Sequence, residues 1–68
     1  MNEIAITLHM PRDELMALSQ FVKRIDFDTC ARFASMTTTY DGAPEADTMW
    51  SALCMLRAQV AEAGFAPR

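Results

Sequence analysis

The feature that most constrains this sequence is a long helical pattern in its last third, bounded by residues that start and stop helices. Apolar side chains recur there at spacings of three and four, the period of one helix face, at Ala46, Met49, Leu53, Leu56 and Val60. Pro44 stands where its missing N–H costs nothing. Gly64 suits a left-handed helix cap, with Phe65 positioned to fold back on Val60. We therefore predict a helix between residues 44 and 64.

Two shorter helices are indicated upstream. Pro11 opens the first, and its inward stripe is predicted to contain Leu15, Leu18, Val22 and Ile25, widened by Phe21, with Ser19 on another face. Asp26 or Asp28 caps the second, which extends to about Met36 and packs through Phe27, Cys30, Phe33 and Ala34.

Residues 4–10 follow a different period. Ile4, Ile6, Leu8 and Met10 alternate with smaller or polar residues, as in a half-buried strand. A strand needs a hydrogen-bonding partner. The sequence offers two candidate partners for this strand. One is the β-rich run Thr37–Tyr40, before the turn signal Asp41-Gly42, and the other is the same strand of a second copy.

The size of the chain favours the second copy. A chain of 68 residues buries only roughly 60% of the surface that its unfolded form exposes. We expect a single domain over residues 1–68 with a mainly α (α+β) fold. It has one N-terminal strand followed by three helices, the strand being paired in a homodimer.

No constellation of reactive residues is visible. The sequence has one histidine, His9, and two cysteines, Cys30 and Cys54, which lie 24 positions apart and are expected to be reduced core thiols. Its two glycines form no phosphate-binding loop. We expect no catalytic residues, no cofactor and no metal site, and therefore a non-catalytic protein. The methionines are expected to fill the core.

Charge points to the kind of partner. The net charge is −3, which disfavours the phosphate backbone of nucleic acid, without excluding it, and favours a protein with a basic surface. The predicted partner-binding residues are Asp41, Glu45 and Asp47, at an exposed turn and helix start, with Trp50 as an anchor. The basic group Lys23, Arg24 and Arg32 is the contrasting surface. We expect a cytoplasmic protein with no membrane segment.

Two resemblances add context. The order of strand, Pro11, helix, turn and helix in residues 4–36 resembles ribbon-helix-helix proteins, which implies a strand-paired dimer that binds DNA. The segments Gln20–Arg24, Leu56-Arg57 and Ala61–Arg68 resemble a family of short uncharacterised proteobacterial proteins of phage and mobile-element neighbourhoods.

These observations give two functional predictions. The first is a mobile-element protein-binding module, an anti-CRISPR-like inhibitor that occludes a basic surface of a host complex. The alternative is a ribbon-helix-helix-like dimeric transcriptional regulator that binds DNA.

Overall fold

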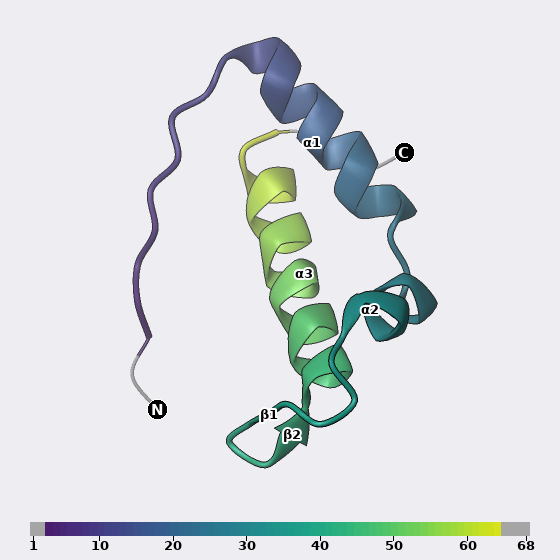
Figure 1. Cartoon of the computed structure of the whole chain (residues 1–68). Helices are drawn as coiled ribbons and strands as arrows, with labels where there is room; N and C mark the ends of the chain where they lie inside the picture. Colours follow the sequence, from purple (N-terminus) through teal and green to yellow (C-terminus); the bar gives the residue numbers. More distant parts are fainter. Residues whose placement is uncertain (1–2, 65–68) are drawn as a thin grey trace.

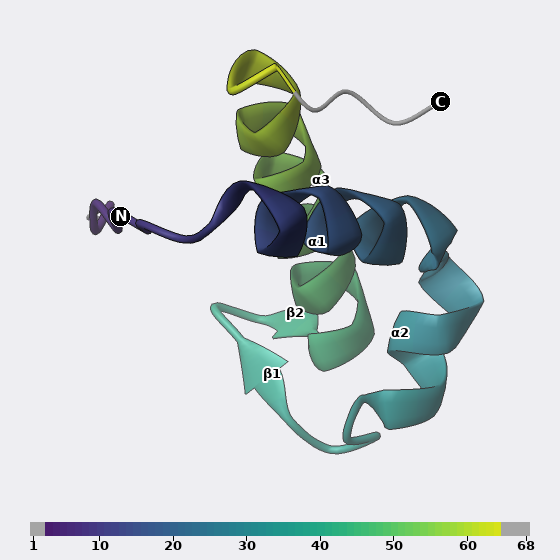
Figure 2. The ribbon, with the colours of Figure 1, turned by 90° about the horizontal axis from the view of Figure 1, so that it is seen from above.

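The longest helix, α3 (Glu45–Glu62), is the support on which the other elements pack. The computed structural model describes residues 3–64. Helix α1 (Arg12–Arg24) crosses α3, and the short helix α2 (Phe27–Phe33) packs beside its first turns (Figures 1 and 2). Between α2 and α3 lies an antiparallel hairpin of β1 (Thr39–Tyr40) and β2 (Ala43–Pro44).

The predicted N-terminal strand is wrong. Residues 3–10 are extended but belong to no sheet, and the hairpin lies instead between the second and third helices. The run Thr37–Tyr40 does contribute a strand, but it pairs with the two residues that follow its own turn. This local hairpin forms in place of a pairing with residues 4–10, because Asp41 (φ 55°) and Gly42 (φ 83°) adopt the left-handed conformation that a two-residue hairpin turn requires.

Helix α1 has the predicted stripe with two corrections, at Phe21 and Ser19. Val22 is buried and Leu15, Leu18 and Ile25 are half-buried, whereas Phe21 is exposed. Ser19 was predicted to point elsewhere but is buried, because it lies three residues before Val22 on the same face. Its hydroxyl donates to the Met16 carbonyl at 2.7 Å, so the burial leaves no polar atom unpaired.

Asp26 is the residue that starts α2. Its Oδ1 accepts from the Thr29 N–H at 2.9 Å and the Thr29 hydroxyl at 2.7 Å. These bonds, the hydroxyl's first, lower the pKa of Asp26. The helix ends at Phe33, before the predicted end, and Phe33 is exposed, so of the predicted apolar face only Cys30 is buried.

Helix α3 ends as the sequence predicts, with Gly64 at φ 95° after the C-cap Ala63. The predicted contact of Phe65 with Val60 lies outside the described residues. On this helix Val60 is buried and Leu53 and Leu56 are half-buried.

The core is thin. The buried apolar side chains among the described residues are those of Val22, Cys30 and Val60. The prediction of two core thiols is confirmed for Cys30 and wrong for Cys54, which is exposed. The prediction of core methionines is wrong for Met16, Met36 and Met55, which are exposed. A domain with so few buried side chains leaves large apolar surfaces in water.

Candidate binding groove

The N-terminal arm, defined as residues 3–10, carries the most exposed run of large apolar side chains. Ile4, Ile6 and Leu8 are 86%, 81% and 63% exposed. No residue of the arm makes a hydrogen bond with any other described residue. Pro11 joins the arm to α1 with φ −58° and ψ 151°, so the chain enters the helix from an extended path. The arm therefore stands beside the domain rather than within it.

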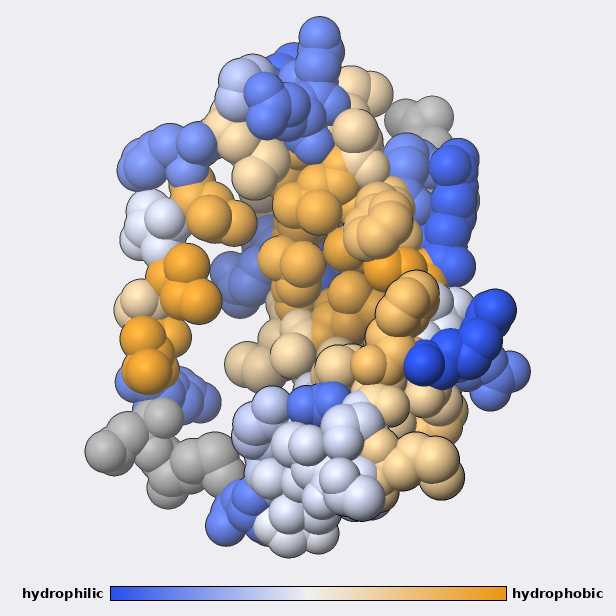
Figure 3. All heavy atoms as spheres, in the orientation of Figure 1, coloured by the Kyte–Doolittle hydropathy of each residue, from blue (hydrophilic) through white to orange (hydrophobic). Residues whose placement is uncertain are grey.

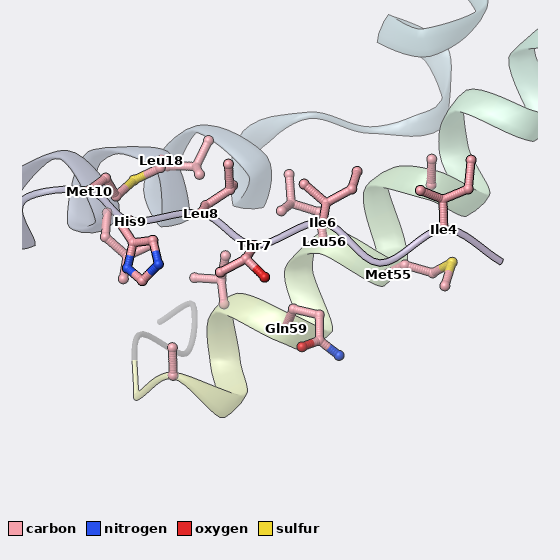
Figure 4. A pocket seen from close by; sticks show the side chains of 14 residues that line it. Ile4, Ile6, Thr7, Leu8, His9, Met10, Leu18, Met55, Leu56 and Gln59 are labelled. Carbon is pink, nitrogen blue, oxygen red and sulfur yellow. The ribbon is translucent and has the colours of Figure 1, made fainter.

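A groove lies between the arm and the helices. It has a volume of about 760 Å³ and is lined by Ile4, Ile6, Thr7, Leu8, His9, Met10, Leu15, Leu18, Ala52, Met55, Leu56, Gln59, Val60 and Ala63. Figure 3 shows open space between the apolar atoms of the arm and the apolar surface of the helices. In Figure 4, Ile4, Ile6 and Leu8 lie on one side of the arm backbone, and Thr7 and His9 on the other.

The composition of this groove suits apolar side chains. Most of its lining is aliphatic, with Met55 from α3 exposed at its edge. Its polar members are Thr7, His9 and Gln59. Among the described lining residues, His9 is the one titratable side chain, and no hydrogen bond joins it to the hydroxyl of Thr7. What it offers chemically is burial of an apolar ligand.

Of the three predicted acidic binding residues, Glu45 makes hydrogen bonds within the protein. Glu45, the first residue of α3, accepts the Ser35 N–H at 2.8 Å and the Tyr40 hydroxyl at 2.9 Å. These two hydrogen bonds lower the pKa of Glu45, and the bond from Ser35 is the larger cause. The hydrogen bond from the Tyr40 hydroxyl to Glu45 also raises the pKa of Tyr40. Glu45 thus ties the hairpin and the end of α2 to α3.

The other predicted partner-binding residues lie around this anchor. Asp41 is exposed at the hairpin turn and Asp47 is exposed in the first turn of α3. Trp50 is half-buried and meets Phe27 edge-on, with ring centroids 6.5 Å apart and an interplanar angle of 86°. Trp50 therefore helps to join α2 to α3.

The contrasting basic residues lie at helix ends. Lys23 and Arg24 are in the last turn of α1, and Arg32 is in the last turn of α2, where cations complement the helix dipole.

Among residues 3–64, no three His, Cys, Asp or Glu side chains gather in a way that could hold a metal ion. No helix in the described part of the chain is long and apolar enough to cross a membrane.

Sequence reasoning missed the groove but not its signal. The alternation of Ile4, Ile6 and Leu8 marks one apolar face, but the half-buried strand predicted from it is wrong, because these side chains are exposed and residues 3–10 form no strand. The error lay in supplying that segment with a strand partner. Residues from α1 and α3 join the lining only because α1 folds across α3, and no local pattern specifies this crossing.

The fold and the groove define a small, mainly helical domain with an extended apolar arm. The chain belongs to a family of unknown function (DUF7706), whose match covers residues 1–68. No curated protein and no solved structure matches the chain.

Proposed function

We propose that this protein is a non-catalytic protein-binding module that holds an apolar segment of a protein in the groove between the arm and helices α1 and α3. The observation that carries the proposal is the exposure of Ile4, Ile6 and Leu8 opposite an apolar helix face. Contiguous apolar surface of this kind is costly in water and marks interaction sites. The scarcity of reactive side chains in the groove supports a binding role rather than a catalytic one.

The cellular role predicted from the sequence remains a proposal within this class. It is a mobile-element inhibitor of anti-CRISPR type that occludes a basic surface of a host complex. The net charge of −3 and the exposed carboxylates of Asp41 and Asp47 support it. Glu45 contributes less to such a contact, because its carboxylate is already occupied by Ser35 and Tyr40.

The alternative, a DNA-binding regulator, rests on the resemblance in residues 4–36. It draws no support from the arm, whose residues 3–10 form no strand in the described chain. Its distinguishing property is duplex DNA binding that weakens steeply as salt is added.

The proposal is tested by comparing the wild type with two arm variants as bait in an extract of the cells that express the protein. Ile4→Lys combined with Ile6→Lys alters the apolar side of the arm, and Ala5→Lys is a matched control on the opposite side. We expect a partner that binds the wild type and the control equally. Binding of the purified partner should weaken at least about tenfold with the double variant, since two buried apolar contacts are lost. Equal affinity for all three baits would refute the groove as the binding site.

A further inference from the structure

We propose that the groove is occupied by the arm of a second copy of this chain, so that two copies exchange arms in a symmetric dimer. This inference rests on the proposed function, because it names the protein segment that the groove holds. Each arm then forms one wall of its own groove and occupies the groove of the other copy. The contact is made through side chains against helices and involves no strand pairing.

The arm has the spacing that the helix face requires. Alternate residues of an extended chain lie about 6.6 Å apart. Successive turns of a helix lie about 5.4 Å apart. Ile4, Ile6 and Leu8 can therefore follow the groove residues of successive turns of α3, such as Ala52, Leu56 and Gln59. The eight residues of the arm span roughly 27 Å when extended, and so does an 18-residue helix.

The arm of the same chain does not fill the groove. Its three large apolar side chains remain 63–86% exposed although they border the groove. Pro11 explains why, since it holds an extended conformation itself and restricts Met10 to extended conformations as well. A sharp bend that would press the arm onto its own α1 and α3 is thus disfavoured. An arm from a second copy carries no such tether to the groove that it enters.

The area that arm exchange would bury is that of a small interface. Full burial of an aliphatic side chain removes roughly 60–120 Å² from water, so three side chains on each of two arms remove roughly 400–700 Å². The helix faces that receive them lose at most a comparable area, because Leu15, Leu18 and Leu56 are already half-buried. The total is therefore at most roughly 800–1,400 Å², whose upper end overlaps the range for specific interfaces of about 1,200–2,000 Å².

Charge does not oppose the contact. Each chain has a net charge of −3, but the described residues that line the groove include no carboxylate and no ammonium or guanidinium group. On the arm itself, Glu3 is the one acidic residue and does not line the groove. The surfaces that meet are therefore nearly neutral, and two-fold symmetry lets the same pair of contacts form twice.

The experiment is a charge-swap complementation read out by light scattering during size-exclusion chromatography. The arm variant is Ile4→Lys with Ile6→Lys. The face variant is Met55→Glu with Gln59→Glu, at two exposed positions of α3 that line the groove. Ala5→Lys and Ala58→Glu are matched controls at exposed positions outside the groove lining. Circular dichroism verifies that each variant keeps its helices.

We expect the wild type and both controls to have twice the mass of the 7.6 kDa chain. Each charged variant alone should be a monomer, its dimer dissociation constant raised at least about a hundredfold. A mixture of the two variants should form a heterodimer. In that heterodimer the lysine arm meets the glutamate face, and the unaltered arm meets the unaltered face.

Three results would overturn arm exchange: a monomeric wild type at high micromolar concentration, dimers that survive in either charged variant alone, or a mixture that stays monomeric. None of them by itself removes the proposed function. That function fails separately, if a purified partner protein binds the wild type and the Ile4→Lys, Ile6→Lys variant with equal affinity.

Discussion

Replacement of Val22 by alanine is the sharpest test of how α1 docks on α3. Val22 is 1% exposed and is one of three buried apolar side chains in the described chain. Two methyl groups are lost, each worth about 0.8 kcal/mol of transfer free energy. With the cavity that remains, the free energy of unfolding should fall by about 2 kcal/mol.

The assay is urea unfolding at a fixed protein concentration, followed by helical circular dichroism and by the fluorescence of Trp50, the single tryptophan. In a separate thermal unfolding experiment the melting temperature should fall by about 10 °C, given the small size of the domain. Met16→Ala, at an exposed position of the same helix, is the matched control and should change stability by less than about 0.5 kcal/mol. If the two variants lose the same stability, the assigned burial of Val22 is wrong.

Three further predictions follow from single contacts. Glu45→Gln should lower the melting temperature most at neutral pH. Because the folded pKa of Glu45 lies below its ordinary 4.5, the carboxylate stabilises the folded state above pH 4.5, and this stabilisation is lost as the pH falls through the folded pKa. A difference in melting temperature between variant and wild type that stays constant with pH would contradict the role of Glu45 in joining the hairpin and α2 to α3. Asp26→Ala should reduce helical circular dichroism and stability by removing the cap of α2, whereas Asp28→Ala, which leaves the cap in place, should have a smaller effect. A thiol reagent should label exposed Cys54 rapidly and buried Cys30 slowly in the native protein, as mass spectrometry of the labelled peptides would show; equal rates would refute the assigned burial.

The acidic residues show how sequence and structure divide a candidate site. Sequence correctly placed Asp41 in a turn and Glu45 and Asp47 at the start of the last helix. It treated the three carboxylates as equivalent because composition and helix position gave no reason to separate them. The hairpin brings Tyr40 to Glu45, and the end of α2 brings Ser35 to the same carboxylate, ten positions away in the chain. That convergence makes Glu45 a structural anchor and leaves Asp41 and Asp47 exposed.

What the sequence determined by itself is local. It placed the three helices, the start of α1 after Pro11, the end of α3 near Gly64 and the Asp41-Gly42 turn, because helix periodicity, caps and turns depend on residues within a few positions of one another. It also marked the alternation of apolar residues over 4–10, but the half-buried strand predicted there is wrong.

Only the tertiary structure decided what those elements meet. Ser19 is buried and Cys54 exposed because the crossing of α1 and the docking of α2 select which faces of the helices are covered. Within residues 3–64 the arm has no strand partner, because Thr39–Tyr40 pairs with its own neighbours and a short loop costs less entropy than a distant pairing. The groove follows from the same choice, since an apolar segment left unpaired beside an apolar helix face exists only once the chain has folded.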